Sequence, residues 1–352
     1  ITFSSSRDPP APYLGGERNQ AAMGESMKIA VVGAGAMGGS YGGLLAKAGH
    51  EVTLIDIWEE HVAAINAKGL RIDGAFGEHV VEVPARTAPE DNQTADMVIV
   101  FTDTNNTEDG AKTAAGLLGN DGFAITFQNG IGNVETLQRV IGPERVLAGS
   151  SMCSAARHGP GHVDLTHQRY TSVGEIDGSN SERALAVVAA LEGAGFNAKT
   201  VPDVMATIWE KFVVNCGFNA IAATTGLRSG EISQVPETAA FQHKVLDEVM
   251  AVVNAKGITL PNPHIAKQIL VGAGKSFNKP SMLQHVEAGR KTEIDAINGA
   301  LLSEGEALGV PTPANEALVA LLKGRELAQM RAVNEPDLDY NAWQARLEAE
   351  AS

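Results

Sequence analysis

Residues 28–38, KIAVVGAGAMG, decide the fold of this chain. The apolar run over 28–32 predicts a buried strand, and glycines follow it at 33, 35 and 38. A G-x-G-x-x-G pattern that leaves a strand and opens a helix is typical of a dinucleotide-binding unit. Its glycines permit a tight turn, the approach of a pyrophosphate, and close helix–strand packing. Alternatively, they serve only a tight turn. We predict that the cofactor is bound by Gly33, Ala34, Gly35, Ala36, Met37 and Gly38.

Asp56 follows this loop at the end of the next predicted strand, residues 51–57. A carboxylate at this position accepts hydrogen bonds from the adenosine ribose and repels a 2′-phosphate. The next residues, 57–60, read IWEE and contain no arginine or lysine. We therefore expect Asp56 to favour NAD(H) over NADP(H). The alternative is that Asp56 only caps the following helix.

Strands and helices alternate from residue 28 to about 200, which predicts parallel strands joined by crossover helices. Strands are expected at 97–101, 123–127, 145–151 and 170–174, and helices at 37–48, 59–68 and 181–194. After Pro202 nearly every apolar pattern is helical, with helices expected at 204–224, 236–256, 264–271, 287–308 and 315–330. The prediction is a dinucleotide-binding α/β domain (27–202) followed by an all-helical domain (203–330). We expect residues 1–26 to be a disordered extension and 331–352 an acidic tail with one helix near 341–349.

Composition excludes several functional classes. The net charge of −15 argues against nucleic-acid binding, which needs a basic surface. No apolar stretch is long enough to predict a membrane span. The two cysteines, Cys153 and Cys216, have neither metal-ligand spacing nor a disulfide pattern, so we expect a cytoplasmic protein. The nine histidines are scattered, and the closest pair, His158 and His162, lies in an expected glycine–proline loop, so no metal site is predicted.

Residues 209–219, WEKFVVNCGFN, carry a polar stripe on an apolar helix. Lys211, Asn215 and Asn219 are four residues apart and therefore share one helix face. Buried amides and ammonium groups are costly unless a partner satisfies them, and a ligand is one such partner. Partial burial also lowers the pKa of a lysine, which suits it to donate a proton. A solvated edge of an amphipathic helix remains the alternative.

Two further clusters have weaker meaning when each is taken alone. Residues 128–130, QNG, follow a predicted strand at the sheet edge where α/β proteins bind ligands, although a simple turn would look the same. Residues 278–284, NKPSMLQ, precede 289–295, GRKTEID. Ser281 suits a helix N-cap, and Glu293 suits the start of a helix, without any catalytic role.

Together these segments resemble the ketopantoate reductase (2-dehydropantoate 2-reductase) family from residue 27 to about 330. The glycine loop and residues 128–130, 209–219, 281–284 and 292–295 carry the resemblance. It implies a Rossmann-type N-terminal domain and a C-terminal domain like that of 6-phosphogluconate dehydrogenase. The implied activity is reduction of a small 2-keto acid by NAD(P)H, namely ketopantoate to pantoate in pantothenate biosynthesis. A homodimer is a possible assembly.

The resemblance also implies roles for single residues. Lys211 would be the general acid that protonates the C2 oxygen, and Glu293 would bind a substrate hydroxyl. Asn129 would lie near the nicotinamide and help to hold the lysine. The substrate pocket would be lined by Asn215, Asn219, Asn278 and Ser281, with Ser281 a candidate for the carboxylate.

Two departures keep other substrates open. Family members commonly use NADPH and have a basic residue where this chain has Asp56. They often have lysine after the strand at 97–101, where this chain reads Thr102-Asp103-Thr104. Both differences favour NAD-dependent D-2-hydroxyacid dehydrogenases of the same fold. A nucleotide-binding sensor without turnover is a third hypothesis, although the intact Lys211 and Glu293 argue against it.

Overall fold

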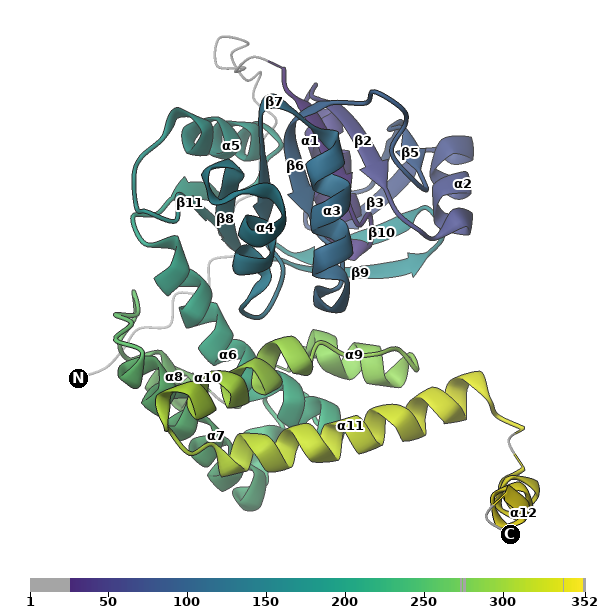
Figure 1. Cartoon of the computed structure of the whole chain (residues 1–352), viewed down its shortest axis with the longest axis vertical. Helices are drawn as coiled ribbons and strands as arrows, with labels where there is room; N and C mark the ends of the chain where they lie inside the picture. Colours follow the sequence, from purple (N-terminus) through teal and green to yellow (C-terminus); the bar gives the residue numbers. More distant parts are fainter. Residues whose placement is uncertain (1–25, 273, 275–276, 338, 351–352) are drawn as a thin grey trace, which may run out of the picture.

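The computed structural model describes residues 26–272, 274, 277–337 and 339–350. The expected disordered extension therefore lies, apart from Ser26, outside the described residues. Figure 1 shows a sheet-containing part at the top and a helical part below it, with helix α6 running from one into the other. The predicted fold class, a Rossmann-like α/β part followed by a helical part, is confirmed.

An eight-stranded sheet forms the centre of the α/β part, in the order β12-β11-β8-β7-β6-β1-β2-β5. From β8 to β5 all neighbours are parallel, as expected, whereas β11 runs antiparallel to β8. The central strands are almost wholly buried because helices cover both faces. The strands are β1 (Lys28–Val32), β2 (Glu51–Ile55), β5 (Ala85–Arg86), β6 (Ala95–Val100), β7 (Leu118–Thr126), β8 (Val146–Ser151), β11 (Thr171–Gly174) and β12 (Ala198–Thr200).

The helices of this part divide between the two faces of the sheet. One face is covered by α3 (Thr107–Leu117) and α4 (Asn133–Ile141), which lie in front of the strands in Figure 1. The other is covered by α1 (Ala36–Lys47) and α5 (Glu182–Gly193). Helix α2 (Glu59–Lys68) packs beside β5 at the sheet edge. The mutually parallel strands from β8 to β5 point their carboxyl ends toward the helical part, so the loops that follow them lie on that side.

A second, four-stranded sheet was not predicted. Its order is β4-β3-β10-β9, and it packs on α1. The expected loop around His158 and His162 is wrong except for the turn at Pro160 and Gly161, because its flanks form a hairpin. Alternation of polar residues with buried Val163 and Leu165 explains the strand that follows the turn. The strands are β3 (Leu70–Gly74), β4 (His79–Val81), β9 (Ser154–Gly159) and β10 (His162–His167).

Helix α6 (Val204–Thr225) is the centre of the helical part, and most of its side chains are buried. It is surrounded by α7 (Pro236–Ala255), α8 (Ile265–Gly272), α9 (Ser281–Glu287) and α11 (Pro313–Asn334). Helix α12 (Tyr340–Glu350) lies apart from this body at the end of α11 (Figure 1). Among the described residues, none of the helices is long and apolar enough to cross a membrane.

The single helix expected over 287–308 is wrong in its first half. Helix α9 ends at Glu287, and Gly289, with φ +62°, turns the chain away. A π-helical turn then covers Asp295–Gly299 before α10 (Ala300–Leu308) begins. Single π-helical turns are frequent at functional sites, and this one begins two residues after Glu293.

Candidate active site

The glycine loop has the geometry of a dinucleotide cradle. Gly33 has φ +91°, and a Cβ on it would lie 2.6 Å from the backbone nitrogen of Thr102. A Cβ on Gly38 would lie 1.9 Å from the Gly33 carbonyl, whereas one on Gly35 would meet nothing within 4 Å. Helix α1 begins just after Gly35 without a side-chain cap, so its first N–H groups are free for an anion. The loop therefore fits the pyrophosphate of a dinucleotide.

The residues between these glycines are held by contacts within the α/β part. The buried His61 donates from Nε2 to the Ala34 carbonyl (2.9 Å) and accepts at Nδ1 from the Gly161 N–H (2.9 Å). This pair of bonds fixes His61 as the neutral Nε2–H tautomer. The Ala36 carbonyl accepts from the Ser40 hydroxyl one turn later (2.7 Å), and the half-buried Met37 packs on the core.

Asp56 lies just beyond the end of β2, half-buried at the mouth of the cradle. Its Oδ1 accepts a hydrogen bond from the backbone N–H of Trp58 (3.0 Å), the residue that precedes α2. This bond closes a turn just before α2, and α2 itself has no side-chain cap. The structure therefore does not show Asp56 as the cap of the helix, and its contact with a ribose stays a prediction.

Lys211 extends from α6 to the carboxyl end of β8. Its Nζ donates to the Ser151 carbonyl at 2.5 Å, a contact between the helical part and the sheet. Burial lowers the pKa of Lys211 to about 8, although the negative charge of Glu293 acts in the opposite direction. An amine of this pKa exists in both protonation states near neutral pH, as a proton donor requires.

Ser151 is itself fixed by a buried hydroxyl network. The Tyr41 hydroxyl, on α1, lies 2.8 Å from Ser151 Oγ and 2.6 Å from Thr171 Oγ1. Ser151 Oγ also accepts from the Cys153 N–H at 3.2 Å. Burial holds the pKa of Tyr41 well above its usual value, so the phenol stays a neutral hydrogen-bonding group.

Glu293 lies in the segment before the π-helical turn, near enough to Lys211 for the two charges to interact. Its Oε2 accepts from Asn129 Nδ2 at 3.0 Å, and its carboxylate also takes a bond from the backbone N–H of Thr104. Burial raises the pKa of Glu293, and the nearby Asp103 raises it further. The Asn129 bond and the Lys211 charge oppose this shift. Asn129 was expected to hold the lysine, but the bond that the structure gives it goes to Glu293. Lys211 is held by a carbonyl instead.

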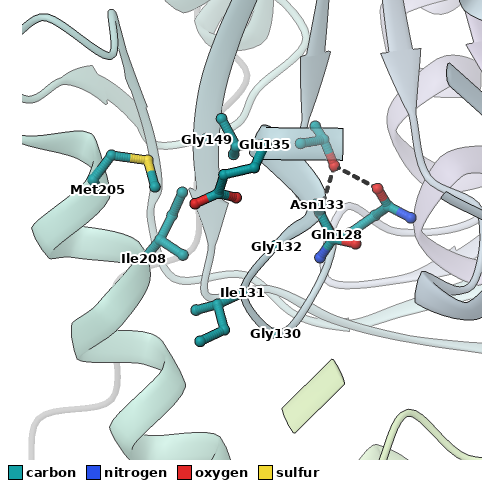
Figure 2. A pocket seen from close by; sticks show the side chains of 11 residues that line it. Gln128, Gly130, Ile131, Gly132, Asn133, Glu135, Gly149, Met205 and Ile208 are labelled. Carbon is teal, nitrogen blue, oxygen red and sulfur yellow. Dashed lines mark hydrogen bonds between the residues drawn. The ribbon is translucent and has the colours of Figure 1, made fainter. Parts of the chain in front are cut away.

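The turn that carries Asn129 is anchored on both sides. Gln128 Nε2 donates to the Thr102 carbonyl (2.7 Å), and Asn133 Nδ2 donates to the Asn129 carbonyl (2.8 Å). Gly130, with φ +82°, lies so close to the Ala296 carbonyl that a Cβ would reach it at 2.3 Å. Figure 2 shows Gln128 and Asn133 on one side of a small cavity behind this turn, opposite Met205 and Ile208 of α6.

The four predicted pocket residues differ in their placement. Asn215 is half-buried one turn beyond Lys211, and its Nδ2 is a buried donor without a partner among the described residues. Asn219 is buried a further turn along. Asn278 is exposed on the segment that leads into α9, and the exposed Ser281 is the first residue of that helix, which packs against α6. No hydrogen bond joins either of these two side chains to Lys211 or Glu293 within the described residues.

Several residues of the site could not be predicted. Ser151, Tyr41, Thr104 and His61 act through contacts between segments far apart in the chain, and none of them stands in a motif. Thr104 also has a buried Oγ1 without a partner among the described residues.

Comparison with known proteins gives a consistent result. The family model described as ketopantoate reductase PanE/ApbA matches residues 29–178, and the model of its C-terminal domain matches 203–326. A 2-dehydropantoate 2-reductase of Archaeoglobus fulgidus is 32% identical over 299 residues, covering 85% of this chain and 98% of that protein. One of Streptococcus pyogenes is 30% identical over 302 residues, covering 85% and 98%.

Solved structures agree with this result. The PanE/ApbA family ketopantoate reductase of Ralstonia eutropha has a TM-score of 0.80 at 33% identity, covering 86% of this chain and 99% of that one. D-mandelate dehydrogenase, solved with NADH and anilino(oxo)acetate, has a TM-score of 0.79 at 27% identity, covering 86% and 99%.

Proposed function

The chain belongs to the ketopantoate reductase family, and on this basis we propose that it reduces ketopantoate to pantoate with a nicotinamide dinucleotide. Residues 27–202 would bind the dinucleotide and 203–330 would supply the catalytic side chains. One observation carries the proposal. Lys211, with its pKa lowered to about 8, and Glu293 come together beside the carboxyl ends of the parallel strands, where the glycine loop also lies.

The chemistry requires a hydride at C2 of the keto acid and a proton on its oxygen. The reduced dinucleotide supplies the hydride when it is bound. Lys211 donates the proton, so the carbonyl becomes a hydroxyl and the lysine is left as a neutral amine. Because the ammonium lies beside the oxygen on which negative charge develops, it also stabilises that charge.

Glu293 positions the substrate in this proposal. Its carboxylate accepts a hydrogen bond from a substrate hydroxyl, in the place where Asn129 donates to it in the present structure. The unpartnered amide of Asn215 is the strongest support for a polar ligand here, because a buried donor without a partner is costly. Asn219, Asn278 and Ser281 would complete the pocket, with Ser281 toward the carboxylate.

A second candidate is an NAD-dependent D-2-hydroxyacid dehydrogenase. Asp56 at the ribose end favours NAD(H) over NADP(H), and the D-mandelate dehydrogenase named above was solved with NADH. Such an enzyme would run the same Lys211 chemistry on a bulkier 2-keto acid. The family membership favours ketopantoate over this alternative.

Steady-state assays test both candidates. Oxidation of NADH and NADPH would be followed with ketopantoate, 2-ketoisovalerate and phenylglyoxylate, in the wild type and in Lys211→Ala. We expect turnover of ketopantoate that Lys211→Ala abolishes. Preference for phenylglyoxylate would favour the second candidate, and no turnover of any 2-keto acid would contradict both.

Two properties of the whole protein are also proposals. A cytoplasmic setting agrees with Cys153 and Cys216 being free thiols. A homodimer can be tested by light scattering of the purified protein.

A further inference from the structure

Arg157 brings a positive charge to the ribose end of the dinucleotide cradle. Its guanidinium carbon lies 4.3 Å from the centre of the Trp58 ring. Trp58 is two residues beyond Asp56 and donates its backbone N–H to that carboxylate. The segment 57–60 has no cation of its own. The tertiary fold therefore supplies, from strand β9, a charge that the local sequence lacks.

The position of Arg157 is fixed by packing on the cradle itself. The Trp58 ring stacks on the buried His61 ring, with centroids 5.3 Å apart and planes at 1°. His61 in turn joins the Ala34 carbonyl of the glycine loop to the Gly161 N–H in the β9–β10 turn. The hairpin that carries Arg157 is thus tied to the loop that fits the pyrophosphate.

The guanidinium of Arg157 is free to take an anion. It is exposed and makes no ion pair or hydrogen bond with any residue that the structure describes, and it packs over the Trp58 ring. Arg86, whose carbonyl accepts the Asp56 N–H, is instead paired with Glu90 at 2.6 Å. A planar guanidinium with free donors suits the geometry of a phosphate.

The helical part also contributes positive charge near Arg157. The charge of Arg157 lowers the pKa of Arg290 and that of His285, so these groups lie in the same region. Burial is the larger cause in both cases, and the carboxylate of Asp103 acts in the opposite direction. An anion bound near both side chains would relieve the repulsion between Arg157 and Arg290.

We propose that Arg157 binds the 2′-phosphate of NADP(H), so that the chain takes NADP(H) as well as NAD(H) in spite of Asp56. The inference rests on the proposed function only in that the glycine loop binds a nicotinamide dinucleotide. Asp56 repels the additional phosphate and Arg157 attracts it. The preference between the two cofactors is therefore set by both residues.

Calorimetric titration of the full chain with NAD⁺ and with NADP⁺ tests this inference without any turnover. We expect Arg157→Ala to weaken NADP⁺ binding about tenfold and NAD⁺ binding less than about twofold, because the lost charge-assisted bond involves the 2′-phosphate alone. Arg157→Lys keeps the charge but loses the planar fork, so its NADP⁺ affinity should lie between the two. Arg139→Ala is the matched control, since this exposed arginine pairs with Glu108 on the outer helices.

Three results would overturn the inference. The first is undetectable NADP⁺ binding to the wild type, and the second is an unchanged NADP⁺ affinity in Arg157→Ala. The third is an equal loss of affinity for both cofactors, which would mean that Arg157 contacts a part of the dinucleotide that NAD⁺ and NADP⁺ have in common. Asp56→Asn should tighten NADP⁺ binding, since it removes the repelling charge. Absence of 2-keto acid turnover would contradict the proposed function while leaving these binding constants, and this inference, intact.

Discussion

The protonation of Lys211 gives a prediction that can be worked through from the structure. Its pKa falls from 10.5 to about 8. The difference corresponds to about 3 kcal/mol of preference for the neutral amine over the ammonium. Reduction needs the ammonium, so its rate should be level below pH 8 and fall about tenfold per pH unit above it. Oxidation of the hydroxy acid needs the neutral amine, so its rate should rise with pH up to about 8.

Glu293→Gln is the informative perturbation. The carboxylate of Glu293 raises the pKa of Lys211. Its removal should therefore move the midpoints of both pH–rate profiles to lower pH, by about one unit for an opposite charge at close range. The neutral amide can still accept a hydrogen bond. The assay is the pH dependence of kcat in both directions, followed by absorbance of the reduced cofactor.

A control and a refuting result are both available for this perturbation. Asp295→Asn removes a carboxylate two residues away that pairs with Lys323 at 2.6 Å, and it should leave the midpoints of both profiles unchanged. Midpoints that stay near pH 8 in Glu293→Gln, or move to higher pH, would refute the assignment of this ionisation to Lys211 next to Glu293.

Three further predictions concern stability. Lys211→Met should abolish turnover yet raise the free energy of unfolding at pH 7 by about 2 kcal/mol, which is the cost of the buried charge less about 1 kcal/mol for the lost bond to the Ser151 carbonyl. The gain should shrink between about pH 8 and 10.5 as the wild-type lysine loses its charge, and urea unfolding at several pH values measures this. Gly130→Ala should lower the melting temperature, at a cost of roughly 2 kcal/mol or more, because φ is +82° and the new Cβ would meet the Ala296 carbonyl. Tyr41→Phe should cost about 1–3 kcal/mol in urea unfolding by leaving Ser151 Oγ and Thr171 Oγ1 short of a partner, and an unchanged midpoint would contradict the network.

The sequence allowed the parts of the fold that depend on local pattern to be predicted. The strand Lys28–Val32 and the helix Glu59–Lys68 have the expected bounds, and α6 is one residue longer than expected, because each follows from periodicity and neighbouring glycines or prolines. The second sheet could not be predicted, since its strands are short and are stabilised by packing on α1, a contact between segments far apart in the chain.

The site residues, like the elements of the fold, could be predicted only where a local sequence pattern determines them. Lys211 and Asn215 could be identified because helical spacing puts them on one face, but the acceptor of the lysine could not, since Ser151 lies 60 positions away. The break between α9 and α10 was missed because the π-helical turn keeps an apolar pattern that continues the helix. The cation at the ribose end was missed because Arg157 reaches Trp58 only in the folded chain.

The hydrogen bond from Asn129 to Glu293 connects the α/β part of the molecule to the helical part. A substrate hydroxyl that binds the Glu293 carboxylate, as proposed, would compete with the Asn129 amide for this acceptor, so the buried carboxylate would keep a hydrogen-bond donor. The proposed substrate contact and this contact between the two parts of the molecule therefore share one carboxylate.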